Sequence, residues 1–409
     1  MEDVYVIGVG MTAFGRHLDR SVQDLAREAV TQALGDAGCA TADVRAVYFS
    51  NTGQGALEGQ HMVRGQIALR ALGLGSVPVV NVENACASGS TAFHLACMQV
   101  RAGAADLVLA VGAEKMCTID KNQAFGLLMG AQDVHGGDAL RRSVRDLARE
   151  GADAHDSRAN HSIFMDVYAG LAKQHMRLYG STPTMFASVT AKNRSHAQHN
   201  PRAQYRTPCT VEEVLGARSI AWPLTLPMCS PVSDGAAAAV LCSAAALRRL
   251  GGRKAVKVLA SVLASGSDRD VDDLDRHITR QASRLAYERA GVGPSEMSLA
   301  EVHDATAVGE VIQVENLGLC EPGRGGELAT VGATSIGGRI PVNPSGGLEC
   351  KGHPIGATGL GQIHELVTQL RGEAGARQVT GARLAIAENG VGFLGYEEAA
   401  ACITILGQP

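Results

Sequence analysis

The 409-residue sequence lacks several features that mark whole classes of protein. No segment approaches the ~20 consecutive apolar residues that a membrane-spanning helix needs. No dense run of lysine and arginine supplies the electrostatic footprint that nucleic acid or an anionic membrane requires, and the formal net charge is −4. We therefore predict no nucleic-acid partner and no insertion into a membrane.

Targeting signals are also missing from the two ends of the sequence. The N-terminal stretch MEDVYVIGVGMTAFG begins with acidic residues, and its apolar run is too short for a signal peptide. The C-terminal residues GQP do not form a peroxisomal address. These observations predict a cytoplasmic protein.

Regular cysteine spacing is the third absence. Ten cysteines are scattered through apolar and helical stretches without CxxC pairs. This distribution argues against a disulfide framework and against a zinc site, and it favours free thiols in a reducing compartment. We predict no bound metal, and we expect most of these cysteines to be small buried apolar residues.

What the sequence does contain is one arrangement of elements used twice. A strand is predicted at 4–10, followed by an amphipathic helix that is capped by Ser21 and closed by Gly38. A similar helix recurs at 277–297, and a strand that runs into polar residues follows it at 299–308. Alternating strands and helices predict an α/β class protein with a largely parallel sheet in each half.

The middle of the chain differs in composition from both halves. Residues 119–227 are rich in His, Arg, Asn and Met and contain the one tryptophan, which predicts an inserted and mostly surface-exposed subdomain. Residues 228–250 return to small-residue, strand-like sequence and are expected to rejoin the first sheet. The predicted domains are thus 1–118 plus 228–250, the insertion 119–227, and 251–409.

The first residue with a chemical signature is Cys86, in NVENACASGSTAF. A thiol where a strand ends and a helix begins sits near unsatisfied backbone N–H groups, and the helix dipole there is expected to lower the thiol pKa. A buried structural role, as for Cys97 or Cys242, is the alternative. The small-residue turn after Cys86 favours a nucleophile.

Two histidines in the second half complete a candidate site. His353, in NPSGGLECKGHPIGATG, would start a helix equivalent to the one after Cys86, so packing of the two halves can bring imidazole and thiol together as an acyl-transfer pair. His303 ends a strand beside Asp304 and is a candidate donor to an oxyanion. The alternatives are a structural histidine in a glycine-rich turn and a strand-end His–Asp pair.

These motifs, taken in order, carry a resemblance that covers nearly the whole chain. The blocks are NACASGSTA, AKQHMRLYGSTPTMFASVTAKNRSHAQHNP, MCSPVSDGAAAAVL, EVHDAT, NPSGGLECKGHPIGATG and EEAAACITIL. Together they resemble the thiolase superfamily, and most closely its sterol-carrier-protein-type branch. The resemblance implies the five-layered thiolase fold, αβαβα, with two pseudo-symmetric halves and an inserted loop domain, assembled as a homodimer or homotetramer.

The resemblance also implies roles for individual residues. Cys86 would form an acyl-enzyme, His353 would deprotonate it, and His303 would belong to the first oxyanion hole. The second hole would use the backbone N–H of Cys86 and of a glycine in the turn Gly390–Gly392. The substrate would be a coenzyme A thioester, with no bound cofactor, and Ser230 matches a pantetheine contact of the family.

The sequence departs from the family where a second cysteine normally moves the proton on the carbon α to the thioester. One usual position holds Ala305, and the C-terminal turn holds Glu388 or Asn389, depending on the register. A buried glutamate can act as a base, whereas Asn389 can only form hydrogen bonds to the substrate. Cys350, three residues before His353, is the other candidate.

Several functions follow from this pattern. The first is an acyl-CoA C-acyltransferase that cleaves a 3-oxoacyl-CoA by thiolysis or forms it by Claisen condensation. The alternatives are acyl transfer to a carbon, oxygen or nitrogen acceptor other than a CoA thioester, and retro-aldol cleavage, which needs no Cys86. A lipid-transfer role would not need Cys86, His303 and His353. Relatives in this branch also work with a small zinc-ribbon and OB-fold partner, which is a further expectation here.

Overall fold

The computed structural model describes residues 2–119, 121–136, 138–149, 161–251 and 254–409. Its strands are β1 (Val4–Met11), β2 (Ala46–Ser50), β3 (Val79–Val82), β4 (Leu107–Glu114), β5 (Ser219–Ala221), β6 (Leu224–Thr225), β7 (Gly235–Ser243), β8 (Val256–Ser265), β9 (Leu299–Glu301), β10 (Leu384–Val391) and β11 (Ala400–Gly407). Within the described ranges, nine of them form one mixed sheet in the order β3-β2-β4-β7-β1-β8-β11-β10-β9, and β5 pairs with β6.

The helices surround and divide this sheet. They are α1 (Val22–Ala37), α2 (Gln54–Glu58), α3 (Arg64–Leu69), α4 (Ser88–Arg101), α5 (Lys121–Leu128), α6 (Ala139–Ala148), α7 (Ile163–Tyr179), α8 (Pro183–Ala197), α9 (Val211–Leu215), α10 (Ala244–Leu250), α11 (Ile278–Ala290), α12 (Ala307–Asn316), α13 (Gly325–Thr330), α14 (Gly347–Lys351) and α15 (Thr358–Leu370). A short 3-10 turn, Ala85–Ala87, precedes α4.

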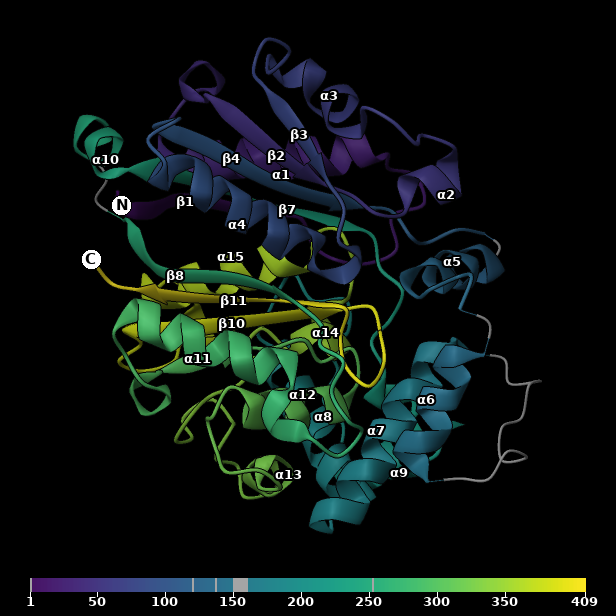
Figure 1. Cartoon of the computed structure of the whole chain (residues 1–409). Helices are drawn as coiled ribbons and strands as arrows, with labels where there is room; N and C mark the ends of the chain where they lie inside the picture. Colours follow the sequence, from purple (N-terminus) through teal and green to yellow (C-terminus); the bar gives the residue numbers. More distant parts are fainter. Residues whose placement is uncertain (1, 120, 137, 150–160, 252–253) are drawn as a thin grey trace.

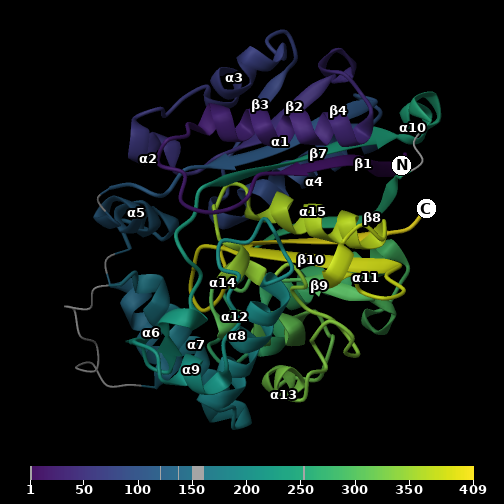
Figure 2. The ribbon, with the colours of Figure 1, turned by 180° about the vertical axis from the view of Figure 1, so that it is seen from behind.

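The elements stack in five layers, as expected (Figure 1). Helix α1 packs on the outer face of β1, β4 and β7, and α11 packs on the outer face of β8 and β11. Helices α4 and α15 lie between the two parts of the sheet and contact each other, which Figure 2 shows from behind. The prediction of an α/β thiolase-type architecture is confirmed.

The two halves repeat one strand order. The first half reads β3-β2-β4-β7-β1 and the second β9-β10-β11-β8, joined where β1 pairs with β8. A parallel bridge between Ala300 and Val342 stands where the first half has β3. In this repeat β9 corresponds to β2, and the segment at Val342 corresponds to β3.

Local sequence explains the best-predicted elements. Ser21 caps α1 through a capping box with Asp24, and Gly38 ends the helix at φ 63°. Gly291 ends α11 in the same way, at φ 68°. Strand β7, GAAAAVLCS, is buried along its whole length between α1 and the middle helices, and its small side chains let these helices approach the sheet.

The two halves meet through backbone contacts that need glycine. A Cβ atom at Gly112 in β4 would lie 2.3 Å from the carbonyl oxygen of Gly356, which precedes α15. The backbone N–H of Gly356 donates to the buried carboxyl of Glu114 at 3.0 Å, and the hydroxyl of Ser50 donates to the Gly356 carbonyl at 2.7 Å. Residues from both halves therefore share one hydrogen-bonded seam.

The segment predicted as a surface insertion is more buried than expected. Helix α8 packs against α12, α13 and α14 of the second half, and α7 packs against α6 and α12. Phe186 and Val189 of α8 lie in an apolar cluster with Val308 and Val311 of α12. The helices of this segment thus form part of the layered body and cover the ends of the second-half strands.

The predictions of free thiols and of no membrane-spanning helix can be compared with the structure. All ten cysteines lie in the described part of the chain, and none of them forms a disulfide, which confirms the prediction of free thiols. Among the described residues, no helix has the length and apolar character needed to cross a membrane.

Candidate active site

Cys86 lies in the short turn before α4, and the chain there adopts an unusual conformation. Ala85 has φ 39°, a left-handed conformation that costs an alanine roughly 1 kcal/mol. The carbonyl of Ala85 accepts hydrogen bonds from the hydroxyls of Ser88, at 2.6 Å, and Thr52, at 3.3 Å. These contacts hold the strained turn and fix the position of the Cys86 side chain.

His353 is held in one tautomer. Its Nδ1 lies 2.7 Å from the hydroxyl oxygen of Thr358, and that hydroxyl donates its own proton to the carbonyl of Pro354 at 3.1 Å. The Thr358 oxygen is therefore the acceptor, and Nδ1 of His353 carries the hydrogen. This leaves a lone pair on Nε2, so His353 is built to accept a proton.

His303 is held in the opposite tautomer. Its Nδ1 lies 2.9 Å from the side-chain nitrogen of Asn389, whose amide oxygen accepts from the Ser90 hydroxyl at 2.8 Å. Since the amide nitrogen donates, Nδ1 of His303 accepts and its hydrogen is on Nε2. His303 is thus built to donate a hydrogen bond. Its backbone N–H also donates to Glu388 at 2.8 Å.

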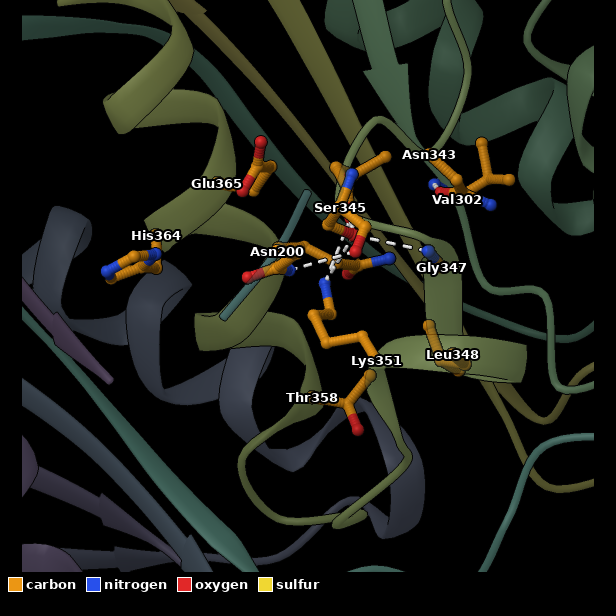
Figure 3. Close-up of polar contacts among 12 residues, drawn as sticks. Asn200, Val302, Asn343, Ser345, Gly347, Leu348, Lys351, Thr358, His364 and Glu365 are labelled. Carbon is orange, nitrogen blue, oxygen red and sulfur yellow. Dashed lines mark hydrogen bonds and ion pairs between the residues drawn. The ribbon is translucent and has the colours of Figure 1, made fainter. Parts of the chain in front are cut away.

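A buried ion pair supports the segment that carries His353 (Figure 3). The ammonium of Lys351 contacts the Glu301 carboxyl at 3.0 Å and the Ser345 hydroxyl at 2.9 Å, and Asn200 donates to the Ser345 carbonyl at 2.9 Å. A charge pair that is fully hydrogen-bonded can be buried without an unsatisfied group. The turn before His353 is therefore tied to β9 and to the segment after α8.

The three predicted catalytic side chains converge. The sulfur of Cys86 and one ring nitrogen each of His303 and His353 lie within 4.8 Å of one another. The two imidazoles pack edge to face, with ring centroids 5.1 Å apart. All three line a cavity of about 280 Å³. Because both Nδ1 atoms bind elsewhere, each ring presents Nε2 to the shared space.

The walls of this cavity come from all three segments of the chain. Residues 161–168 of the insertion, the stretch 226–232 and the turn Val391–Gly392 line it, together with Glu398. Most of the lining side chains are apolar, among them Phe164, Met165 and Leu226. A cavity of this kind, with a few converging polar groups, is typical of a binding site for an apolar acyl chain.

Comparison with known proteins identifies the family. Residues 4–219 match the model of the thiolase N-terminal domain, and residues 261–408 match that of the thiolase C-terminal domain-like family. The chain belongs to the thiolase family. The resemblance inferred from the motifs is therefore confirmed.

Curated relatives place this thiolase among acyltransferases. It is 40% identical to an acetyl-CoA acetyltransferase of Methanothermobacter thermautotrophicus over 95% of this chain and 96% of that protein. It is 36% identical to human sterol carrier protein 2, covering 95% of this chain and 70% of that protein. It is also 35% identical to benzoylsuccinyl-CoA thiolase subunit BbsB of Thauera aromatica, covering 92% and 91%. The chain is an enzyme of the acyltransferase class.

Solved structures share the fold at low identity. A complex described as "Ltp2-ChsH2(DUF35) aldolase" aligns with a TM-score of 0.75 at 23% identity, covering 99% of this chain and 98% of that chain. Human mitochondrial 3-ketoacyl-CoA thiolase in complex with CoA aligns with a TM-score of 0.69 at 17% identity, covering 100% and 98%. These likenesses confirm the thiolase fold.

The charge state of the thiol in this thiolase differs from the sequence-based expectation. Burial, together with the carboxylate of Glu114, raises the pKa of Cys86 to about 12, although a backbone hydrogen bond opposes this. The helix start was expected to lower the pKa of this thiol, but burial has the larger effect. Removing a thiolate from water costs more free energy than the N–H groups of one helix turn recover. At neutral pH the thiol is protonated and needs a base.

The two histidines stay neutral for the same reason. Burial lowers the pKa of His303 to about 4, and burial together with the neighbouring His303 lowers the pKa of His353 well below its usual value. Both imidazoles are therefore uncharged at physiological pH. A neutral base and a neutral donor face the protonated thiol.

Other residues singled out from the sequence lie in different places. Ser230 and Gly392 line the cavity with Cys86. Among the described residues that form its wall, neither Glu388 nor Cys350 appears. Cys350 is fully buried in α14 against Ala197 and Ala203.

Asn389 and Asp304 have contacts that sequence reasoning did not foresee. Asn389 lies behind His303, and its partners are His303 and Ser90. Asp304 does not orient the neighbouring imidazole, because its carboxyl accepts from the backbone of Leu348 at 2.6 Å and from Asn193 at 3.1 Å. It therefore anchors α14.

Tyr168 and Glu398 are among the cavity residues that were not singled out from the sequence. Tyr168 of α7 and Glu398, just before β11, line the cavity with Cys86. Tyr168 falls within a segment that reads as an ordinary amphipathic helix. Glu398 is the second glutamate of a polar pair before an apolar strand, a pattern that usually marks a loop.

The cluster of one thiol and two imidazoles also resembles a zinc ligand set. The hydrogen bonds that fix the two tautomers explain the same geometry through proton transfer alone. Absence of a metal therefore stays a prediction.

Proposed function

We propose that this thiolase transfers acyl groups from coenzyme A thioesters through an acyl-Cys86 intermediate. The observation that carries the proposal is the convergence of Cys86, His303 and His353, with opposite tautomers, on one cavity. The acylation half of the reaction follows from this geometry.

Each atom has a role in the acylation step. Nε2 of His353 takes the thiol proton of Cys86 as the sulfur attacks the thioester carbon. The carbonyl oxygen gains negative charge and accepts a hydrogen bond from Nε2–H of His303. The bond from carbon to the CoA sulfur then breaks, and the CoA thiolate takes the proton back from His353. A backbone N–H of the Cys86 turn or of Gly390–Gly392 would bind the oxygen of the second thioester.

The reaction we favour is thiolytic cleavage of a 3-oxoacyl-CoA or the reverse Claisen condensation. Its support is the acetyltransferase relative at 40% identity, which this chain covers almost end to end. Ser230, on the cavity wall, is a candidate pantetheine contact. Both directions need a group that moves the α proton and reaches the cavity.

A second function has support from one substitution. Ala305, which lines the cavity, stands where sterol-carrier-type relatives are expected to keep a second cysteine. An enzyme without an α-proton carrier can still pass the acyl group to a carbon, oxygen or nitrogen nucleophile that needs no activation. Retro-aldol cleavage is less well supported, because it makes no use of Cys86.

Assembly partners are part of the proposal. We propose a homodimer or homotetramer that works in the cytoplasm, and a small zinc-ribbon and OB-fold protein as a further partner. A solved complex of the same fold is described by its title as containing a DUF35 component. Co-purification of the enzyme with products of adjacent genes tests this.

The acyl-enzyme is tested by intact-mass measurement after mixing the protein with acetyl-CoA. The wild-type protein should gain one acetyl group, and Cys86→Ala should not. Cys229→Ala, which removes the other thiol among the described cavity-lining residues, should retain the label. An acetylated Cys86→Ala protein would refute the nucleophile assignment.

The two functions are separated by following turnover. The acyl-enzyme is offered free CoA and, separately, an acyl-CoA that carries α protons. Formation of a 3-oxoacyl-CoA supports the thiolase reaction, whereas re-formation of acetyl-CoA from free CoA only reverses the acylation that both functions share. Acylation without a 3-oxoacyl-CoA product across a panel of thioesters would favour the second function.

A further inference from the structure

The hairpin that joins β10 to β11 brings a carboxyl group to the active-site cavity. Glu398 lies two residues before β11, and its side chain keeps 16% of its surface exposed. That side chain lines the same cavity as Cys86 and His303. The hairpin is closed by a hydrogen bond from the backbone N–H of Ala399 to the carbonyl of Val391 at 2.8 Å, so residues 392–398 form one loop above the site.

Glu398 lies against the glycine turn in which related enzymes are expected to hold their second cysteine. A Cβ atom at Gly390 would lie 2.8 Å from Cγ of Glu398. It would also lie 3.2 Å from Oε1 of Glu388, so the two glutamates flank the same glycine. The turn thus has no thiol of its own, but a carboxyl group from the facing strand covers it.

The Glu398 carboxyl is held by neutral groups. Oε1 accepts from the side-chain amide of Gln313, and Oε2 is buried without a hydrogen-bond partner. The nearest cation-forming group, Nε2 of His277, lies 3.3 Å from Oε2. Nδ1 of His277 accepts from the Thr279 backbone at 3.2 Å, and burial lowers the pKa of His277 well below its usual value. This imidazole is therefore neutral and does not fix the carboxyl as an ion pair.

The pKa shifts beside Gly390 favour a carboxyl group that can hold a proton. Burial raises its pKa, and burial together with Glu398 raises the pKa of Glu388 to about 8. Two buried carboxyls beside one glycine resist double ionisation, so one of them holds a proton while the other is charged. Of the two, Glu398 reaches the cavity.

We propose that Glu398 moves the α proton in place of the family's second cysteine. The assignment rests on the proposed function and extends it by one catalytic residue. In cleavage, Cys86 sulfur bonds to C3 of a 3-oxoacyl-CoA, the C2–C3 bond breaks, and its electron pair on C2 takes the proton of the Glu398 carboxyl. In condensation, the Glu398 carboxylate removes a proton from the α carbon of the second thioester. The resulting carbanion attacks the acyl-enzyme, Cys86 leaves as the thiolate, and the proton that Glu398 took from carbon then passes to the Cys86 sulfur by way of His353.

The experiment separates the two halves of the reaction in the full-length enzyme. Acylation of Cys86 by acetyl-CoA is followed by intact mass, and exchange of the α protons of acetyl-CoA with D2O is followed by mass spectrometry of the thioester. Glu398→Gln should acylate within about threefold of wild type and lose exchange by about 10²-fold or more. Glu398→Asp, which keeps a carboxyl, should recover part of the exchange.

Two further variants sharpen the result. Glu315→Gln changes a buried glutamate of α12, bound to His175 and the backbone of Gly325, that is outside the cavity wall. It should leave both readouts unchanged. Glu388→Gln tests the rival carboxyl, and its Oε1 can still accept from the His303 backbone.

The outcomes are distinct. Wild-type exchange in Glu398→Gln would overturn the proposal, and so would loss of exchange in Glu388→Gln with exchange retained in Glu398→Gln. A wild-type enzyme that acylates but never exchanges would overturn it as well. Failure of wild-type Cys86 to acylate would instead refute the proposed function. If Glu398→Gln fails to fold, as judged by its melting temperature, Glu398→Asp decides: a fall of at least threefold in exchange with acylation retained supports the proposal, and exchange at the wild-type rate overturns it.

Discussion

Burial shifts the pKa values of the titratable groups on the two sides of the cavity in opposite directions. On the wall formed by β9 and the start of α15, burial lowers the pKa of His303 to about 4 and that of His353 well below its usual value. On the side of the β10–β11 hairpin, burial raises the pKa of Glu388, which lies behind the cavity wall, to about 8, and it also raises the pKa of Glu398. One cause, desolvation, thus keeps the bases uncharged on one side and favours the protonated form of the acids on the other.

These opposite pKa shifts allow one small cavity to move two kinds of proton. A neutral imidazole is ready to accept the thiol proton of Cys86, whereas a protonated carboxyl is ready to give a proton to carbon. The imidazole wall brings no net charge to the thioester.

Removing the base on the imidazole wall should have the largest effect. His353→Gln should slow acylation of Cys86 by about 10²–10⁴-fold, because the thiol, with a pKa of about 12, then has no proton acceptor. Stopped-flow release of CoA measures this rate. Raising the pH should restore part of it, since hydroxide forms the thiolate directly, and a rate that stays flat up to pH 10 would count against the assignment.

Removing the hydrogen-bond donor His303 on the same wall should slow acylation less. His303→Leu should slow acylation by about 10²–10³-fold, the usual effect of losing one oxyanion donor. The loss should appear in kcat more than in KM for the acyl-CoA, because the hydrogen bond strengthens as charge develops. An effect confined to KM would show that His303 only shapes the cavity.

Removing the side chain that fixes the tautomer of His303 should have a smaller effect on the rate of acylation. Asn389→Leu keeps a side chain of similar size but removes the donor to Nδ1, so Nε2 no longer carries the hydrogen at all times. Acylation should fall by about 10-fold, less than the loss of the ring itself. Asn389→Gln serves as the control that keeps an amide, and it should retain more activity than Asn389→Leu.

Ionisation of Glu388 should make the stability of the folded enzyme depend on pH. The folded enzyme holds a proton on Glu388 up to a pKa of about 8, whereas the unfolded chain releases it near 4.5. The stability from this group is therefore present at low pH and declines as pH rises toward 8, by at most ~1.4 kcal/mol per pH unit. Glu388→Gln cannot titrate, so its melting temperature should fall less than that of wild type between pH 6.5 and 8. Parallel curves would contradict a shared proton on the hairpin side of the cavity.

The comparison also shows what the sequence could and could not predict. The helix capped by Ser21, the closure at Gly38 and the convergence of Cys86 with His353 were predicted, because they depend on local caps or on the repeat of one unit. The contact between His303 and Asn389 joins residues 86 positions apart, and its register could not be chosen from the glycines alone.

The thiol pKa was predicted in the wrong direction for a similar reason. The helix start beside Cys86 is visible in the sequence, but the burial and the Glu114 carboxylate that outweigh it depend on packing between distant segments. Glu398 was missed because its place over Gly390 depends on how the β10–β11 loop folds back. Local pattern predicted which residues are reactive, and tertiary packing set their proton affinities.

The contact between the two halves at Gly356 decides when Cys86 and its base come together. Because Glu114 of one half binds the turn that follows His353 in the other, the thiol and its base are in register only while both halves are docked. In a partly folded chain Cys86 therefore lacks the base that removes its proton, and its acylation by an acyl-CoA requires the docked halves.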